Sequence, residues 1–211
     1  MTSSERTIGL FPLPLVLLPG EILPLHIFEE RYKALIAACR ASGDVFGIVL
    51  HDDDTLAGQG CTAAIDDVVD ELDDGRLNII VTGRERFTVG ELLAPDDPES
   101  DYLRGQVELF DDIDLAVAPQ QFAAALAKDL FRTMVRLMGV DDPRVPDGAS
   151  PLSFRLAVAV DFGQPLKQRL LESRSETERL DLLIAVMKAL IPGLELRKER
   201  EQAIGGNGKG Y

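Results

Sequence analysis

The sequence has few of the residues from which metal and redox sites are built. It contains two cysteines, Cys39 and Cys61, and two histidines, His26 and His51. The cysteines form no C-x-x-C pair, and the histidines are far apart in the chain. Structural zinc sites usually gather four such ligands at short spacings. We therefore expect two reduced thiols in a cytoplasmic protein, and no metal site.

The chain also lacks a long apolar run that could form a continuous helix. Its most apolar stretch, FPLPLVLLPGEILPLHIF from Phe11 to Phe28, contains four prolines. Each proline removes a backbone donor and disfavours helix at the preceding residue. A bilayer-spanning helix of about 20 residues is thereby excluded, and residues 1–7 lack the basic start of a secretory signal. The stretch predicts short buried strands, with a type II turn at Leu18–Glu21.

Basic residues are scarce in the first part of the chain. Residues 1–117 hold 24 of the 36 acidic residues but only 8 of the 22 basic ones, so their net charge is −16, whereas residues 118–211 carry +2. Such an acidic surface repels phosphate backbones and anionic lipids. This distribution argues against nucleic acid and membrane partners, and it would keep an apolar binding surface in solution.

Known catalytic motifs are missing. The chain has no P-loop, no G-x-G-x-x-G and no G-x-S-x-G. Asp52–Asp54 could in principle bind magnesium, but a solvated turn followed by an exposed loop at Thr55–Gly60 is the preferred interpretation. His26 is interpreted as a hydrogen-bonded core or turn residue rather than a general base. We predict no catalytic residue and no cofactor.

The first part of the chain has the pattern of a β structure with one helix. An apolar run at Val45–His51, an Asp-Gly turn at Asp73–Gly75 and two later alternating segments indicate five or more short strands. Short strands with glycine turns predict a small barrel or rolled sheet. The inserted helix is expected over EERYKALIAACRAS (Glu29–Ser42) and places four residues on one face: Tyr32, Leu35, Ile36 and Cys39.

After Pro119 the apolar residues recur with the period of a helix. A long amphipathic helix is expected up to Gly139, with this stripe: Phe122, Leu126, Leu130, Met134 and Leu137. Two shorter helices and a last helix follow. The last one opens with the capping-box spacing of Ser175 and Glu178, and Pro192 should kink or break it.

The pattern as a whole predicts an α+β protein. Residues 1–117 form a β-rich subdomain, residues 118–203 form a helical bundle, and residues 204–211 have the composition of a flexible tail.

One long segment resembles a known family. LFPLPLVLLPGEILPLHIFEERYKALI (Leu10–Ile36) is similar to the opening pattern PLFPL…VLFPG…LPLHIFE.RY of the Lon protease N-terminal, or substrate-binding, domain. GRERFTV (Gly83–Val89) resembles the family's G-x-x-R-F-x-V strand, and the late helix is a weaker match ending at Leu190. The signature residues, interpreted as mainly structural, are Pro19, Gly20, Pro24, His26, Phe28, Glu29, Arg31, Tyr32, Gly83, Arg86 and Phe87.

The resemblance implies a PUA-like β-pseudobarrel with one inserted helix, followed by a helical bundle. It also implies a non-catalytic module that binds polypeptide segments or a partner protein, such as an adaptor or regulator in protein quality control. Because the sequence ends at Tyr211 without an ATPase or peptidase domain, it resembles a stand-alone small form of the domain.

The surface that binds such a segment is the least defined part of this prediction. Three methionines are candidate peptide contacts in a groove bordered by the barrel and the bundle: Met134, Met138 and Met187. Flexible methionines suit tolerant recognition, although methionines on or near helix stripes more often belong to the ordinary core.

Other functions stay open, because fold alone does not imply function. The chain could be a homo-oligomeric structural protein. It could also be an unrecognised small-ligand-binding protein or hydrolase that uses the pseudobarrel pocket. RNA binding fits a PUA-like fold, but the charge distribution opposes it.

Overall fold

The computed structural model describes residues 5–52, 55–95, 101–113 and 117–206, and it divides into two compact units. The barrel unit comprises the chain up to Asp112 together with Asp161–Glu172. The helical unit comprises Ile113–Val160 and the chain from Ser173 onward. Each unit is described by itself.

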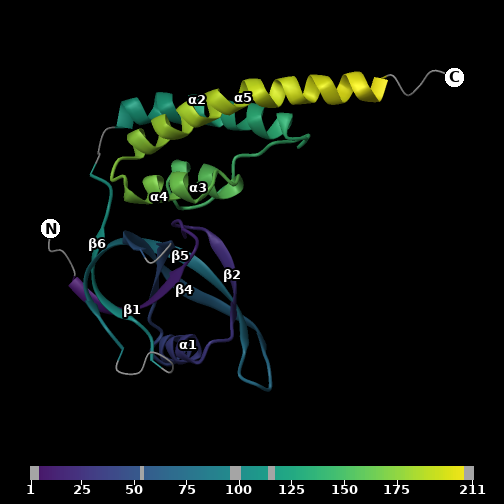
Figure 1. The fold of residues 1–211 in the computed structure, drawn as a ribbon. Helices are drawn as coiled ribbons and strands as arrows, with labels where there is room; N and C mark the ends of the chain where they lie inside the picture. The colour runs from purple at the N-terminus through teal and green to yellow at the C-terminus, as the bar shows by residue number, and fades with distance from the viewer. Residues whose placement is uncertain (1–4, 53–54, 96–100, 114–116, 207–211) are drawn as a thin grey trace. The chain divides into compact units, whose positions relative to one another are not determined.

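The barrel unit is built from six strands that close on themselves (Figure 1). Their order is β2-β5-β4-β3-β1-β6, and β6 also pairs with β5, which closes the sheet. Among the described strands, only β1 and β3 pair in parallel. This confirms the predicted pseudobarrel. The strands are β1 (Glu5–Leu13), β2 (Ile22–Ile27), β3 (Phe46–Asp52), β4 (Thr55–Glu71), β5 (Leu77–Leu93) and β6 (Arg104–Phe110).

Alternate residues of the strands fill the barrel. One core cluster contains Ile8, Leu10, Val49, Phe87 and Val107, all nearly inaccessible to solvent. Side chains of a strand alternate between its two faces, so every second residue of these strands can enter the core.

The inserted helix, α1 (Glu30–Ser42), is confirmed together with its predicted buried face. Tyr32 on that face stacks on the ring of Phe11, with ring centroids 3.9 Å apart. The helix ends at Gly43, whose φ of 75° is the left-handed conformation that glycine adopts readily.

The predicted Asp-Gly turn is also confirmed, but the loop before β4 is not. Leu72 N donates to Arg76 O at 2.9 Å across the turn. Thr55–Gly60, expected as an exposed loop, is instead the beginning of β4 and pairs with the end of β3. Its Leu56 packs against the barrel core, which a loop prediction from polar neighbours could not show. Asp53 and Asp54 lie outside the described residues.

The helix α4 (Gln164–Glu172) belongs to the barrel unit and not to the helical bundle. Gln164 Oε1 accepts a hydrogen bond from Val16 N at 2.7 Å, and Lys167 Nζ lies 2.5 Å from Glu21 Oε1. The unit border therefore differs from the expected one, which followed residue 117 and assigned every later helix to the bundle. Contacts between residues so far apart in sequence leave no trace in local periodicity.

The helical unit contains α2 (Val117–Leu137), α3 (Leu152–Ala159) and α5 (Glu176–Gly206), with α2 and α5 side by side (Figure 1). The expected stripe of α2 is wrong at Phe122, which is 77% exposed. Ala123 and Ala127 are buried in its place. The buried face of α2 is thus shifted by one residue in its first turns, and it continues through Phe131 and Met134.

The helix α5 begins as predicted and does not end where predicted. Glu178 N donates to Ser175 Oγ at 3.1 Å, the expected capping bond. The break at Pro192 is wrong, because the helix continues through it to Gly206. Pro192 and Lys188 are both exposed, so water can bind the Lys188 carbonyl that the proline leaves unpaired. Of the expected tail, residues 204–206 are helical and residues 207–211 lie outside the described residues.

Candidate functional site

The segment with the strongest signature begins with a tight turn. Glu21 N donates to Leu18 O at 3.0 Å, and Gly20 has a φ of 81°, which confirms the type II turn. Gly20 N donates to Gly83 O at 2.8 Å, and Gly83 N donates to Glu21 O at 2.9 Å. A Cβ at Gly83 would lie 2.2 Å from Leu18 O, so no larger residue fits there. Three signature residues, Pro19, Gly20 and Gly83, thus fix where β2 starts.

The strand β2 exposes every second residue to solvent. Ile22 is 67% exposed and Phe28, which follows the strand, is 59% exposed. Pro24 and His26 between them are exposed as well. Pro24 suits β2 because, among the described strands, β2 pairs with β5 alone and one edge needs no donor there. The segment therefore has an inward face and an apolar outward face.

His26 lies on this outward face and not in the core or a turn, where the sequence had suggested it. Its Nδ1 is hydrogen-bonded to Asn78 Oδ1 at 2.7 Å, and its ring lies 5.9 Å from the ring of Phe28. These contacts hold the imidazole beside Phe28. Among the described residues, no group of three or more His, Cys, Asp or Glu is arranged to hold a metal ion.

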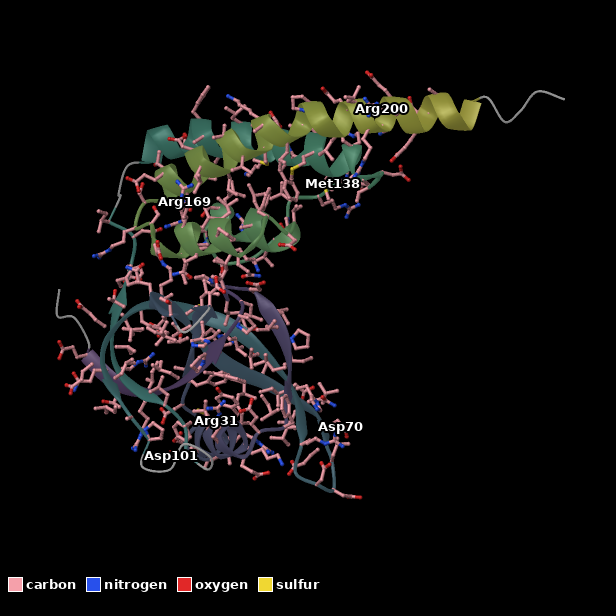
Figure 2. All side chains as sticks on the ribbon, viewed as in Figure 1. Arg31, Asp70, Asp101, Met138, Arg169 and Arg200 are labelled. Atoms are coloured by element: carbon pink, nitrogen blue, oxygen red, sulfur yellow. The ribbon has the colours of Figure 1, made fainter. Side chains whose placement is uncertain are left out.

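Neighbouring strands extend the face and give it an acidic border. Pro24 is paired with Ile80 of β5, and Ile80 is paired with Asp67 of β4. One row further along, Asn78 connects His26 with Asp70 in the same way. Residues directly paired across strands point to the same face. Figure 2 labels Asp70 on the β4 arm.

We refer to this surface as the β2 face. It consists of Ile22, Pro24, His26, Phe28, Asn78, Ile80, Asp67 and Asp70.

The signature continues into the first turn of α1. Arg31 Nη2 lies 2.6 Å from Glu29 Oε2, and the Arg31 guanidinium sits 4.7 Å from the Tyr32 ring centroid. Burial raises the pKa of Tyr32 above its ordinary value. These residues line one side of a cavity of ≈ 490 Å³. Its other lining residues are Phe11, Pro12, Leu13, Pro14, His51, Leu56, Leu92 and Leu103.

The remaining signature residues are structural. Phe87 is completely buried in the barrel core. Arg86 is 6% exposed; it donates to Leu171 O at 3.1 Å and to Asp112 Oδ1 at 2.5 Å. It thereby joins the end of α4 and the segment after β6 to β5. The prediction that the signature residues are mainly structural fits Arg86 and Phe87 better than it fits Pro24, His26 and Phe28.

The methionines and cysteines occupy different environments. Met134 and Met187 are 1% and 0% exposed, as the core interpretation of these side chains expects, while Met138 is 50% exposed. Both thiols are buried and unpaired, and burial raises the pKa of Cys39 to about 11 and that of Cys61 to about 12. In the described part of the chain, none of the helices is long and apolar enough to cross a membrane.

A closed barrel of this topology, with the turn and strand of the LPLHIFE segment at its edge, defines a substrate-binding domain of the Lon type. Residues 7–189 match the family model described as the ATP-dependent protease La (LON) substrate-binding domain. This chain belongs to that family.

Similar proteins agree with this assignment. The chain is 27% identical over 209 residues to the Lon protease of Anaeromyxobacter dehalogenans and 26% identical over 211 residues to that of Vibrio parahaemolyticus. The alignments cover 90% and 92% of this chain but 24% and 26% of those proteins, so the chain spans about a quarter of their length.

Solved structures show the same fold. A Lon N-terminal domain protein from Xanthomonas campestris has a TM-score of 0.65 at 28% identity, over 85% of this chain and 98% of that one. The N-terminal domain of a Mycobacterium avium complex Lon protease has a TM-score of 0.66 at 22% identity, over 87% and 98%.

Proposed function

We propose that this chain is a non-catalytic module that binds apolar segments of polypeptides on the β2 face. The family model carries the general role, since it describes a substrate-binding domain. The observation that carries the location is the exposure of Ile22 (67%) and Phe28 (59%) on one face of the signature strand. Clustered exposed apolar side chains with a polar border mark interaction sites.

The border of the β2 face selects the chemistry of the bound segment. Asp67 and Asp70 are exposed and stand across β5 from the apolar residues of β2. A segment with leucine or phenylalanine followed by lysine or arginine would contact both parts of this surface. Affinity should be modest, with a Kd in the micromolar range or weaker, as expected for a small exposed patch.

The proposed partner is either an unfolded segment or an exposed segment of a protein, as for an adaptor or regulator in protein quality control. The chain itself would neither hydrolyse ATP nor cleave an unfolded protein such as casein. Turnover that copurifies with the chain and is removed by a point substitution would contradict the non-catalytic part of the proposal.

Amide-shift mapping tests the location of the site. An unfolded peptide rich in leucine, phenylalanine and lysine is titrated into labelled protein, and a matched peptide with glutamate in place of lysine serves as the control. We expect saturable shifts at β2 and at residues 78–80, with weaker binding of the acidic peptide. Shifts confined to the cavity beside Tyr32, or no shifts at millimolar concentration, would overturn the assignment to the β2 face.

A further inference from the structure

The strand β2 leaves one of its two edges without a neighbouring strand. Among the strands that the structure describes, β2 is the one that pairs along its whole length on one side only, with β5. No other described helix or strand runs beside it, and it lies at the margin of the barrel unit (Figure 1). The unpaired edge of a sheet presents backbone donors and acceptors to which a further strand can bind.

The pairing with β5 decides which backbone groups of β2 point outward. Gly83 N donates to Glu21 O at 2.9 Å, so Glu21 occupies a hydrogen-bonded position of the antiparallel ladder. Such positions alternate along a strand, and the register of β2 on β5 has no shift, so every second residue from Leu23 onward is bonded to β5. The residues between them direct their N–H and carbonyl groups away from β5: Ile22, Pro24 and His26.

These outward backbone groups are available to a ligand. In the part of the chain that the structure describes, the N–H groups of Ile22 and His26 have no hydrogen-bond partner. Pro24 has no N–H, and it occupies a position where β5 requires none. We call the outward N–H groups of Ile22 and His26, together with the outward carbonyl groups of all three residues, the β2 edge. An extended polypeptide backbone supplies the complementary carbonyl and N–H groups at the same spacing.

A comparison with β4 shows that β2 lacks the usual protection of an open edge. Residues 64–71 of β4 also pair with β5 alone, because the pairing with β3 ends at Ala63. That half of β4 contains two register shifts and these acidic residues: Asp66, Asp67, Asp70 and Glu71. Charged side chains and bulges prevent an edge from accepting another strand. The strand β2 contains no acidic residue, lysine or arginine and no register shift, so it is the edge that stays open to pairing.

We propose that the polypeptide segment bound at the β2 face adds to the β2 edge as a further strand of the barrel sheet. This inference rests on the proposed function and specifies how the same site holds its ligand. Segment residues paired with Ile22, Pro24 and His26 point their side chains toward the β2 face, so apolar residues at alternate positions extend its apolar surface. The backbone bonds supply affinity for any sequence, and the alternate side chains supply selectivity. The acidic barrel unit attracts lysine or arginine at the ends of the segment.

N-methylation of single peptide amides tests the backbone pairing without changing the protein. The probe is the peptide Lys-Leu-Thr-Phe-Thr-Leu-Lys, titrated into labelled protein and followed by amide shifts. Its apolar residues can lie opposite Ile22, Pro24 and His26, where their N–H groups donate to the β2 edge. An N-methyl group on one of these apolar residues removes that donor and should weaken binding about tenfold or more. The same group on either threonine points to solvent and should change the affinity little.

The outcomes separate this inference from the proposed function. Saturable shifts at β2 with equal losses for N-methyl groups on apolar residues and on threonines would overturn strand addition and leave the proposed function standing. The absence of any binding at β2 would overturn both.

Amide hydrogen exchange measured by NMR tests the same pairing on the side of the protein. In the free chain, the amides of Ile22 and His26 should exchange faster than those of Leu23 and Leu25, which are bonded to β5. Saturating unmodified peptide should slow exchange at Ile22 and His26 about tenfold or more. The peptide with an N-methyl group on its phenylalanine, at the same concentration, is the control and should protect them far less. Unchanged exchange at both amides while the shifts show a saturated site would overturn strand addition.

Discussion

Among the described residues, the barrel unit and the helical unit each bury one arginine, and the two arginines have different sets of partners. In the barrel unit, Arg86 binds Asp112, whose side chain is 24% exposed, and stacks over Phe110 at 4.7 Å. In the helical unit, Arg179 is completely buried and binds Glu176, whose side chain is 14% exposed. It stacks over Phe154 at 4.4 Å.

Both arginines bind residues next to the points where the chain leaves its unit. Arg86 holds Asp112 and Leu171, which lie at the two borders of the barrel unit. Arg179 Nη1 donates to Ser173 O at 2.8 Å, at the border of the helical unit. The guanidinium fork can bind several acceptors at once. In each unit, a buried arginine thus binds the residues at which the chain enters or leaves that unit.

The two units differ strongly in net charge. The barrel unit contains 25 acidic and 10 basic residues, for a net charge of −15, and the helical unit contains 11 and 12, for +1. Two barrel units repel each other, which suits a face that binds segments of other proteins. A nearly neutral helical unit lacks this repulsion.

Arg179→Met should produce the largest effect and should confine it to the helical unit. Removing the cation leaves the Glu176 carboxylate and Ser153 buried without it, which costs about 3–5 kcal/mol. Hydrogen exchange followed by mass spectrometry should show faster exchange in α5 and unchanged exchange in β5. The control is Arg132→Met, which removes an exposed ion pair with Asp129 and should change little. Equal loss of protection in both units would contradict their independence.

Gly83→Ala should do the reverse and weaken the barrel unit. The new Cβ would lie 2.2 Å from the Leu18 carbonyl oxygen, so the turn before β2 must move. We expect a loss of about 2–3 kcal/mol in urea unfolding, with faster exchange in β2 and β5. Gly58→Ala, where no described atom lies within 4 Å, is the matched control and should not destabilise the fold. A stable Gly83→Ala variant with native exchange in β2 would show that the turn tolerates a side chain.

Ser175→Ala should have a smaller effect, again in the helical unit. It removes the acceptor for Glu178 N at the start of α5, at a cost of about 1 kcal/mol. Thr133→Ala inside α2 is a suitable comparison, since alanine is the better helix former there and no loss is expected. The two variants can be compared by thermal unfolding. A lower melting temperature for Thr133→Ala than for Ser175→Ala would contradict the capping role.

The two buried thiols of the barrel unit should have the smallest effect, which is on how stability depends on pH. The pKa of Cys39 is raised from 9.0 to about 11, and that of Cys61 to about 12. Below pH 9 both thiols are neutral in folded and unfolded chains. Above pH 9 the unfolded thiols ionise first, so this contribution to stability is lost as pH rises toward 11–12. At pH 8, labelling with a thiol reagent should be slow at both sites, and slower at Cys61; rapid labelling of Cys61 in the folded chain would contradict its burial.

Local sequence patterns predicted the helices and strands better than they predicted which residues pack against other elements. The spacing of Tyr32, Leu35, Ile36 and Cys39 predicted the buried face of α1, because a helix with one packed side leaves a clear period. The same reasoning failed for α2, since it favoured the large Phe122 over the small Ala123.

The site was predicted less well than the fold. The letters of LPLHIF are apolar on nearly every position, so alternation could not tell which side faces water. That required the pairing of β2 with β5 and the position of Pro24 at an edge. By alternation along its strand, Arg86 should point away from the core residues and be exposed. It is nonetheless buried, because segments distant in sequence cover it. Neither the exposed side of β2 nor the burial of Arg86 can be predicted from the local spacing of apolar residues.

The affinity of two matched phenylalanine variants for the lysine-containing apolar peptide tests the central claim most directly. Phe28 on the β2 face and Phe122 on the helical unit are both more than half exposed, at 59% and 77%. Isothermal titration should show that Phe28→Ser weakens binding about tenfold or more, while Phe122→Ser leaves it unchanged. Equal affinity of the Phe28→Ser variant and the wild-type chain would contradict recognition by the β2 face.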